Sequence, residues 1–465
     1  IRPLRQRVLA EIRPPKRPQP PGRPERVLHV VHGWPPWNHA GTEMYAAWLA
    51  RRQAEVRDVA VYSRIADPER AHGDAVETLD RGVRVRSVVN NFTQRDPLSR
   101  NGLRDRTIEA DFARFLDQFN PRVVHVHHLA GHSAGLLRVA ARRKVPVVYQ
   151  VQDWWAPCAR VNLFDAWRRL CSGPGIGKCS ACRPLTGVPP APVLNRLLYS
   201  HRLSQFRKLL GIPEAFVMGS RFILDSYLEL GFLDKDSLVF VIPYGVELGP
   251  IPDARPARTP GAPLRFGLIG SILPHKGIHV AVEAFAGIDP ARATLTVWGD
   301  PSIDPDYTRE LEGLRGPGTE VRERFEDDRK AEVFGSLDAL IVPSLGLESF
   351  GLVAREAMHH SVPVLATRRG ALSEMFLGGD FGALFNPEEP AELRGWIERL
   401  AADPGILDRW RERLPTVKGM EQHTEEMEQV YEKVLADKIL LDRTLTGKFS
   451  RKKGKWPATW TKKRR

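Results

Sequence analysis

Two glutamates eight residues apart stand where a short apolar run gives way to a helical pattern. Residues 339–342 form an apolar run typical of a buried parallel strand, and residues 351–358 have helical composition without proline. We therefore expect Glu348 in the loop before the helix and Glu356 inside it, about two turns below the first helical residue. The free N–H groups of the first turn can bind an anion, while the deeper carboxylate accepts hydrogen bonds from a vicinal diol. A phosphate group with a ribose beside it fits this layout.

The same two glutamates also have an interpretation that needs no ligand. A carboxylate near a helix N-terminus complements the helix dipole, and one further along commonly lies on a solvated face of the helix. The spacing of Glu348 and Glu356 does not by itself separate the two interpretations. The surrounding sequence decides between them.

The wider segment carries a family resemblance. Residues 339–358, ALIVPSLGLESFGLVAREAM, resemble the E-x7-E signature of retaining glycosyltransferases with the GT-B fold, family 4 in the sequence classification. The resemblance continues through residues 361–387, a strand followed by a glycine-rich turn and a short helix, and it reaches back to residues 264–285. It covers most of residues 27–435.

This resemblance implies a role for each chemical group. Lys276 is expected to contact the diphosphate of a nucleotide-sugar donor, Glu348 the transferred sugar, and Glu356 the ribose. Lys276 and Glu348 are the predicted catalytic residues, because the chemistry is chiefly stabilisation of a departing diphosphate and requires no catalytic divalent metal. The other predicted donor-binding residues lie in glycine-containing loops and in the first turn of the helix: Gly41, Gly270, Ser271, Ser349, Phe350, Gly351 and Leu352.

The chain departs from the family pattern at two sites. Ser271 stands where the family often has an arginine facing the diphosphate, so Lys276 must neutralise more of the charge, with Arg221 as a candidate helper. Gln152 replaces the histidine of an H-D-x-W segment, whereas Asp153 is retained. A glutamine can still hydrogen-bond a sugar, but it cannot titrate.

Histidines cluster in residues 123–137, where His127 and His128 follow a predicted strand. Ligands bind at the carboxyl ends of parallel strands, so we predict that one of these two histidines contacts sugar. Their alternative is a structural role, and the spacing of His125 and His127 matches no zinc pattern. Similarly, Gly41 precedes a helix and either lets the backbone approach a ligand or serves only the turn.

All four cysteines lie within 25 residues: Cys158, Cys171, Cys179 and Cys182. Four thiolates ending in C-x2-C predict a structural, tetrahedral zinc site that fixes an irregular loop. Disulfides are the alternative, although an enzyme that uses intracellular sugar nucleotides works among reductants. A similar insertion occurs in a subset of family 4 enzymes, with proline where this chain has Ala159.

Apolar runs alternate with helical stretches along two parts of the chain. This alternation predicts an α/β fold of two Rossmann-like, doubly wound parallel sheets that face a central cleft. The predicted strands of the first part are residues 27–32, 56–61, 83–89, 123–127 and 145–152, and those of the second begin at 264 and continue at 295–298, 339–342 and 362–366.

The same pattern divides the chain. We expect a basic, proline-rich segment in residues 1–26 and an acceptor domain in residues 27–240, with the cysteine-rich insertion at 154–190. The remainder is then a donor domain over 241–418, a helix over 419–442 that crosses back to the first domain, and a basic tail over 443–465.

The net charge of +13 is concentrated at the two ends. Residues 1–26 carry +6 and residues 443–465 carry +10, which leaves −3 for the body. Together with Trp456 and Trp460, the basic tail predicts docking on an anionic membrane surface, although a solvated end is its alternative. No uncharged apolar run of about 18 residues is present, so we expect a cytoplasmic protein, peripheral on the inner face of a membrane. Because the sequence begins with Ile1, we expect that residues precede it.

These observations predict a retaining transferase that moves a sugar from a nucleotide-diphosphate sugar to a glycan, lipid-linked or other hydroxyl acceptor. Its expected setting is the biosynthesis of cell-surface polysaccharide or glycoconjugates. Two other classes remain open: a zinc-containing nucleic-acid-binding protein, which the nearly neutral body disfavours, and a GT-B sugar-nucleotide epimerase or phosphorylase.

Overall fold

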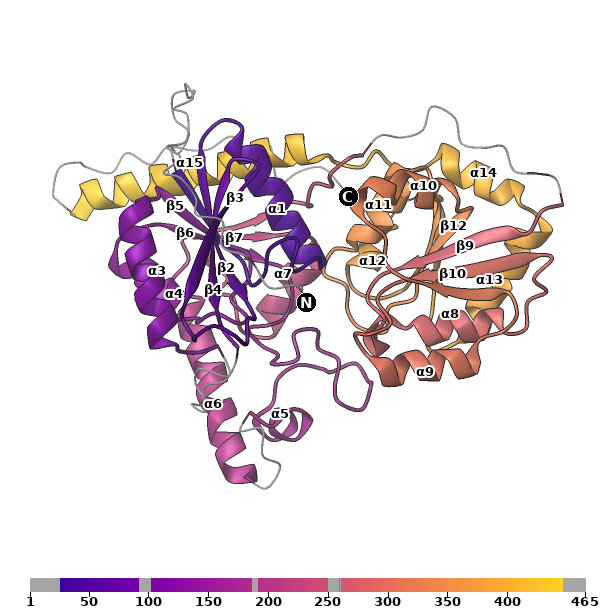
Figure 1. The fold of residues 1–465 in the computed structure, drawn as a ribbon, viewed down its shortest axis with the longest axis horizontal. Coiled ribbons are helices and arrows are strands. Elements are labelled where there is room, and N and C mark those ends of the chain that lie inside the picture. The colour runs from indigo at the N-terminus through magenta and orange to yellow at the C-terminus, as the bar shows by residue number, and fades with distance from the viewer. Residues whose placement is uncertain are drawn as a thin grey trace.

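The structure is a computed structural model that describes residues 26–91, 102–185, 191–249, 259, 261–377 and 379–445. It has two α/β lobes joined side by side, and one long helix passes from the second lobe back over the first (Figure 1). The basic segments predicted to be tails lie almost wholly outside the described residues. Of the helices in the described part, none combines the length and the apolarity that crossing a bilayer requires.

The first lobe is built on an eight-stranded sheet with the order β3-β4-β2-β1-β5-β6-β7-β8. All neighbours are parallel except β3 and β4. Its strands are β1 Arg26–Val30, β2 Asp58–Ile65, β3 Ala75–Asp80, β4 Val83–Val89, β5 Val123–Val126, β6 Val147–Val151, β7 Ala215–Met218 and β8 Val239–Val241. Its helices are α1 Gly41–Ala54, α3 Arg106–Phe119, α4 Leu136–Arg142, α5 Ile176–Cys182, α6 Pro192–Leu209 and α7 Arg221–Glu229.

The second lobe is built on a six-stranded, wholly parallel sheet with the order β11-β10-β9-β12-β13-β14. Its strands are β9 Leu264–Ile269, β10 Ala293–Trp298, β11 Thr319–Arg322, β12 Ala339–Val342, β13 Val364–Thr367 and β14 Gly382–Phe385. Its helices are the short η1 Pro274–Lys276 and η2 Asp327–Arg329, then α8 Ile278–Phe285, α9 Pro305–Leu314, α10 Lys330–Gly335, α11 Leu352–His359, α12 Ala371–Met375, α13 Pro390–Ala402 and α14 Gly405–Glu412.

Strand order in both sheets places a ligand crevice at a defined point. The order reverses direction between β1 and β5 in the first sheet and between β9 and β12 in the second. Loops leaving the carboxyl ends of two such strands diverge to opposite faces of the sheet and leave a crevice between them. The site should therefore be assembled from the residues that directly follow β1, β5, β9 and β12.

The last helix, α15 Met420–Leu445, packs against the first lobe. Its side chains Met427, Val430 and Tyr431 are buried with Trp48 and Leu49 of α1 in one apolar cluster. The chain thus passes between the lobes twice, once before β9 and once before α15.

The two chain crossings are hydrogen-bonded to one another. Val246 and Gly419 form an isolated parallel bridge. In it the Val246 N–H donates to the Lys418 carbonyl at 2.9 Å, and the Met420 N–H donates to the Val246 carbonyl at 3.1 Å. The two crossings between the lobes are therefore tied to one another at one backbone bridge.

Candidate functional site

Lys276 and Glu348 meet at the crevice of the second sheet. Lys276 ends η1, which follows β9, and Glu348 lies in the loop after β12. The Lys276 Nζ lies 2.7 Å from Glu348 Oε1, and Ser344 Oγ donates to the same oxygen at 2.7 Å. Burial alone would raise the pKa of Glu348, but the charge of Lys276 and these hydrogen bonds outweigh it and lower the pKa. The carboxylate is therefore ionised and held beside a cation.

Backbone packing permits only glycine at two positions of these loops. A side chain at Gly277, whose φ is +67°, would place its Cβ 2.0 Å from the Pro343 carbonyl oxygen. At Gly370, with φ of +60°, a Cβ would come within 2.5 Å of the Glu348 carbonyl oxygen. The loops that carry Lys276 and Glu348 are consequently packed backbone against backbone, which fixes their separation.

The N-terminus of α11 lies directly after Glu348. Its N-cap residue is Gly351, with φ of +77°, which has no side chain to satisfy the N–H groups of the first turn. Such a helix end attracts an anion through its N–H groups and its dipole. Ser349 and Phe350 line the approach. The Ser349 carbonyl accepts from Ser220 Oγ of the first lobe at 2.7 Å, and the Phe350 ring is buried against Tyr244.

Glu356 lies closer to the start of α11 than predicted. The helix begins at Leu352, so Glu356 is four residues along it, a little more than one turn rather than about two. Its Oε1 lies 2.7 Å from Lys330 Nζ, which also contacts Asp327 at 3.0 Å and stands over the Trp48 ring of α1. Burial raises the pKa of Glu356, and Lys330 only partly offsets this. A diol at Glu356 would bind beside this lysine.

The remaining predicted donor residues occupy different settings. Gly270 and Ser271 follow β9 directly and precede η1. A Cβ on Gly41, the first residue of α1, would touch Leu352 at 3.8 Å, so the starts of α1 and α11 face each other across the lobes. The Arg221 guanidinium pairs with Asp225 on its own helix, while its backbone N–H donates to Glu374. In this arrangement the Arg221 side chain is bound to its own helix, α7, and its backbone N–H is bound to α12.

The crevice of the first sheet holds a cluster of four ionisable side chains. His32 follows β1, His128 follows β5, Asp153 follows β6, and Glu43 lies in the first turn of α1. His32 Nε2 lies 3.1 Å from Glu43 Oε1, His128 Nε2 lies 2.9 Å from Asp153 Oδ2, and the two imidazole rings are 4.3 Å apart.

Several buried atoms at this crevice have no hydrogen-bond partner among the described residues, His32 Nδ1 among them. Two others are Glu43 Oε2 and the Nε2 of Gln152, the residue that stands where the family pattern has histidine. Burial raises the pKa of Glu43 and lowers that of His32 well below its usual range, so His32 is neutral. The crevice therefore offers an unused carboxylate oxygen and an unused amide N–H, a suitable pair for a hydroxyl group.

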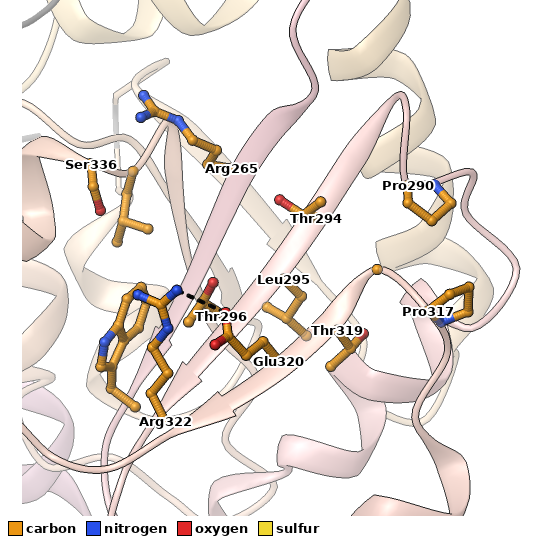
Figure 2. Close-up of a pocket in the computed structure, with 13 residues that line it drawn as sticks. Arg265, Pro290, Thr294, Leu295, Thr296, Pro317, Thr319, Glu320, Arg322 and Ser336 are labelled. Atoms are coloured by element: carbon orange, nitrogen blue, oxygen red, sulfur yellow. Dashed lines mark ion pairs between the residues drawn. The ribbon is translucent and has the colours of Figure 1, made fainter.

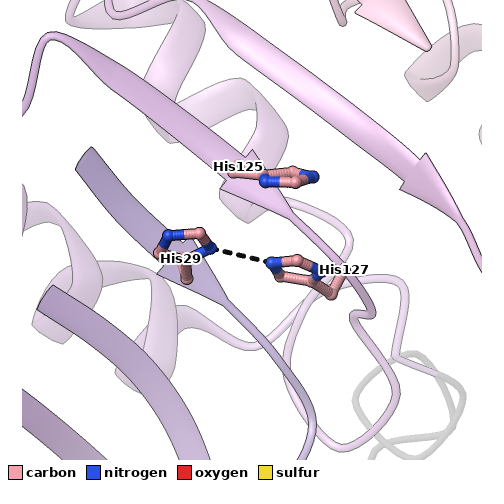
Figure 3. Close-up of side chains that lie close together, drawn as sticks. All are labelled: His29, His125 and His127. Carbon is pink, nitrogen blue, oxygen red and sulfur yellow. Dashed lines mark hydrogen bonds between the residues drawn. The ribbon is translucent and has the colours of Figure 1, made fainter. Parts of the chain in front are cut away.

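Of the two histidines predicted as possible sugar contacts, His128 lies at this crevice, whereas His127 is buried away from it. Its ring is 1% exposed, and its Nε2 lies 2.8 Å from His29 Nδ1. His125 lies beside both, and one ring nitrogen from each of the three histidines lies within 4.8 Å of the others (Figure 3). The rings point into the packing between the sheet and α15, because strand alternation turns residues 125 and 127 to the same face.

This histidine trio is joined by hydrogen bonds to α1 and α15. His29 Nε2 bonds to Gln53 Oε1 at 2.8 Å and His125 Nδ1 to the Tyr431 hydroxyl at 2.7 Å. Gln53 in turn donates to Glu428 of α15 at 2.8 Å. The 2.8 Å contact between the His29 and His127 rings is itself a hydrogen bond. We therefore assign the trio to the attachment of α15.

The four cysteines line one small cavity together with Tyr199. None is in a disulfide. Backbone N–H groups point at two of the sulfur atoms, from Gly175 to Cys179 and from Ala166 to Cys182, each at 3.3 Å. No three of the four sulfur atoms lie as close together as the 4.8 Å that the histidine trio meets in the described part of the chain. A tetrahedral zinc needs sulfur atoms roughly 3.8 Å apart, so binding would draw this loop together.

A larger pocket lies elsewhere on the second lobe. It has a volume of about 420 Å³ and is formed on the sheet by β9, β10 and β11, with Arg265, Thr296 and Arg322 among its lining residues (Figure 2). No predicted donor or acceptor residue lines it. Cavity volume alone would therefore point to the wrong place, because the candidate site lies at the carboxyl ends of the strands.

Sequence reasoning missed His32 and Glu43. Both carry a signal that could have found them: His32 comes two residues after the end of β1, and Glu43 comes two residues after Gly41. Each is therefore at the carboxyl end of the strand beside the reversal of strand order, where a ligand is expected.

Two family models match the chain, one on each lobe. Residues 39–173 match the glycosyl transferase 4-like domain, and residues 263–403 match the glycosyl transferases group 1 model. The first match contains Glu43, Asp153 and two of the cysteines, and the second contains Lys276, Glu348 and Glu356.

Curated relatives match part of the chain. D-inositol 3-phosphate glycosyltransferase from Xylanimonas cellulosilytica is 30% identical over 301 residues, which are 61% of this chain and 64% of that protein. The enzyme of the same name from Acidothermus cellulolyticus is 31% identical over 223 residues, 43% of this chain and 49% of that protein. The matched part spans about half to two thirds of these two relatives.

Solved structures match nearly the whole chain. Sucrose-phosphate synthase from Thermosynechococcus elongatus has a TM-score of 0.62 at 20% identity, covering 89% of this chain and 100% of that one. HepE from Anabaena, in complex with UDP and glucose, has a TM-score of 0.59 at 14% identity, covering 91% of this chain and 100% of that one. These matches confirm the predicted fold class, the GT-B arrangement of two parallel-sheet domains.

Proposed function

We propose that this chain, which carries a glycosyl transferase 4-like domain followed by a group 1 glycosyl transferase domain, is a retaining glycosyltransferase. It takes a sugar from a nucleotide-diphosphate sugar and gives it to a hydroxyl acceptor, a glycan or lipid-linked sugar of cell-surface polysaccharide or glycoconjugate biosynthesis. The observation that carries this proposal is the ion pair of Lys276 and Glu348 next to the uncapped start of α11, which faces the start of α1.

The second lobe binds the donor. The Lys276 ammonium and the first-turn N–H groups of α11 hold the diphosphate, and Glu356 accepts from the ribose. As the bond between the sugar C1 and the diphosphate oxygen breaks, negative charge builds on that oxygen, and Lys276 stabilises it. Glu348 orients the sugar ring. The acceptor oxygen bonds to C1 on the face that the diphosphate leaves, and its proton passes to the departing phosphate oxygen.

The first lobe binds the acceptor. The unused Glu43 Oε2 accepts a hydrogen bond from an acceptor hydroxyl, and the unused Gln152 Nε2 donates one. His128 and Asp153 complete the polar surface. Leaving a buried carboxylate oxygen unpaired costs free energy, so filling it with a hydroxyl favours binding.

The cysteine cavity binds a structural zinc. Cys158, Cys171, Cys179 and Cys182 would supply four sulfur ligands and leave no open position. Burial raises the pKa of the Cys158 and Cys179 thiols in the metal-free state, and zinc would replace their protons. Such an ion stabilises the loop and takes no part in the sugar transfer.

We also propose that the C-terminal tail docks on an anionic membrane surface. Residues 446–465, which lie outside the described residues, carry nine Lys/Arg and no acid. Each basic residue near such a surface contributes about 1 kcal/mol, so engagement of a few is sufficient for salt-sensitive binding. A lipid-linked acceptor would be met at this surface.

Donor screening followed by product analysis tests the function. UDP-, GDP-, ADP- and TDP-sugars are compared by thermal stabilisation, since a ligand at 100 times its dissociation constant adds about 2.7 kcal/mol. The stabilising donor is then incubated with hydroxyl acceptors, and the anomeric configuration of the product is read by NMR. We expect retention in the wild-type chain, loss of transfer in Lys276→Ala, and normal transfer in the control Lys433→Ala on α15. An inverted product, or an epimerised donor without acceptor, would contradict the proposal.

A further inference from the structure

The cysteine loop, residues 154–185, extends from the first lobe to the second. In Figure 1 the part of the chain before α5 lies beside α9 of the donor domain. Arg168 of this loop makes a two-pronged contact with Glu310 of α9, with its Nη1 at 2.9 and 2.7 Å from the two carboxylate oxygens. Its guanidinium carbon stands 5.5 Å from the centre of the Tyr307 ring. The ring of Phe164 lies 6.4 Å from that of His275.

The contacting residues sit on a small hairpin whose base carries a cysteine. Phe164 and Leu170 form an antiparallel bridge, and the Cys171 N–H donates to the Leu163 carbonyl at 2.8 Å. The Asp165 carboxylate accepts from the N–H groups of residues 167 and 169 and so closes the turn. Arg168 itself has φ of +58°, a costly conformation for a residue with a side chain. The hairpin therefore presents Arg168 from a fixed base.

The surfaces that the hairpin touches support both loops of the donor site. Tyr307 is fully buried, and its hydroxyl accepts from the His279 N–H at 3.1 Å, three residues beyond Lys276. The carbonyl of His275 accepts from the N–H groups of Leu345 at 2.9 Å and Gly346 at 2.8 Å, in the loop that leads to Glu348. The two contact points are thus linked through hydrogen bonds to the loops of Lys276 and Glu348, so a change at either point can shift those loops.

We infer that the hairpin of residues 163–171 acts as a latch, that is, a contact that holds the two lobes together across the cleft. Arg168 is then a positioning residue for donor binding. It reaches neither the diphosphate nor the sugar, and acts through Glu310, Tyr307 and His275 on the loops of Lys276 and Glu348. The inference rests on the donor site of the proposed function. Cys171 lies at the base of the hairpin and also lines the cysteine cavity, so the proposed zinc would hold the latch in place as well as the loop.

Charge reversal and charge exchange test the latch. Arg168→Glu and Glu310→Arg each replace attraction by repulsion, whereas the double variant restores an opposite pair in exchanged positions. Glu312→Arg, on the same helix, is the matched control because Glu312 contacts Arg315 of its own lobe. UDP, GDP, ADP and TDP are titrated calorimetrically, and the tightest is used throughout. Each single variant should bind it two- to five-fold more weakly, as expected for loss of one exposed ion pair, and the double variant should return to within about two-fold of wild type.

Hydrogen exchange of the nucleotide-free protein separates the latch from the donor assignment. Amides of residues 274–280 and 345–350 should exchange faster in Arg168→Glu and return to wild-type rates in the exchanged pair, with Glu312→Arg unchanged. Faster exchange without any nucleotide binding by wild type would support the latch and overturn the proposed function. Nucleotide binding that is equal in wild type and Arg168→Glu would overturn the latch, whatever the exchange rates.

Discussion

Glu348 and Glu356 differ in the cation that each one holds, and this difference separates their expected roles. Glu348 pairs with Lys276, which contacts no second carboxylate among the described residues and can turn to a diphosphate. Glu356 pairs with Lys330, which is also held by Asp327. We therefore expect a bound donor to displace the first pair and to add to the second.

The first prediction concerns substitution of these two residues. Glu356→Gln should weaken nucleotide binding about 10- to 150-fold, because it removes a charged acceptor worth about 1.5 to 3 kcal/mol. Glu348→Gln should lower kcat more than donor affinity, because its partner is the sugar. Steady-state kinetics with saturating acceptor measure both. Glu332→Gln, an exposed residue paired with Arg329, is the control. Wild-type kinetics in both Glu348→Gln and Glu356→Gln would exclude these roles.

Glu43 gives the second prediction. In Glu43→Gln the unpaired buried oxygen is replaced by a neutral amide, so a hydroxyl acceptor loses a charged hydrogen-bond partner. We expect the acceptor KM to rise about tenfold or more, with the donor dissociation constant unchanged. Glu55→Gln at the other end of α1, where Glu55 pairs with Arg52, should leave both constants unchanged. A change in the donor dissociation constant alone would mean that Glu43 contributes to donor binding and not to acceptor binding.

Sequence predicted which residues meet on the donor side better than on the acceptor side. Lys276 and Glu348 are 72 positions apart, yet a family motif fixes each of them locally. His32 and Glu43 meet only because β1 and α1 turn back on one another, and their motif is weak. The burial of His127 also depends on α15, which comes about 300 residues later and which no local pattern around the histidines announces.

At the scale of elements, the cysteine loop contains residues in costly backbone conformations. Val161 and Leu163 have φ of +78° and +50°, conformations that cost free energy in residues with bulky side chains. Such backbone persists where the surroundings over-determine it. Four sulfur ligands around one ion would supply that constraint.

The third prediction follows for the metal. Purified protein should contain one zinc per chain by elemental analysis, and Cys179→Ser combined with Cys182→Ser should remove it. Limited proteolysis should then cut within residues 154–185, while the donor domain stays folded because its core shares no residue with the loop. Ser180→Ala, between the two cysteines, is the control. Two disulfides by mass spectrometry without any metal would overturn the zinc proposal.

The strands that sequence missed are short or only half-buried. β3 is a largely half-buried antiparallel edge strand without an apolar run, and β8 has only three residues. Long buried strands such as β4, and the fully buried β12, matched their predicted bounds, because an apolar run bounded by polar or turn residues strongly favours a strand. Between α14, which ends at Glu412, and α15, which begins at Met420, the chain passes between the lobes.

At the scale of the whole molecule, the buried histidines make the first lobe sensitive to acid. Burial lowers the pKa of His29 to about 4, from 6.5 in an unfolded chain. A depressed pKa means that the neutral form is favoured by folding. Its contribution to stability is therefore complete above pH 6.5 and is lost as the pH falls towards 4.

The fourth prediction states this quantitatively. Between pH 7 and pH 5 the free energy of unfolding of the first lobe should fall by about 2 kcal/mol from His29 alone. Urea unfolding at the two pH values measures the fall, and His29→Gln, which does not titrate, should show a smaller one. An equal fall in both proteins would mean that His29 is not a cause of the acid sensitivity.

The fifth prediction concerns the C-terminal tail. Deleting residues 446–465 leaves α15 intact but removes nine positive charges. The truncated protein should no longer sediment with vesicles of anionic lipid, while nucleotide binding is unchanged. Neutral vesicles and high salt serve as controls, since both remove the attraction. Equal sedimentation of the full and truncated chains would mean that the tail does not bind the membrane and is only a solvated end.

The backbone bridge that ties the two chain crossings together at Val246 and Gly419 also has a mechanical consequence. Because both crossings meet at this one bridge, we expect any motion of one lobe against the other to pivot there. In Figure 1 the crossings lie near α15, whereas the cysteine loop lies at the opposite end of the junction, beside α9. The ion pair of Arg168 and Glu310 at that opposite end is far from the pivot. A single ion pair there would therefore act on the separation of the lobes with a long lever arm.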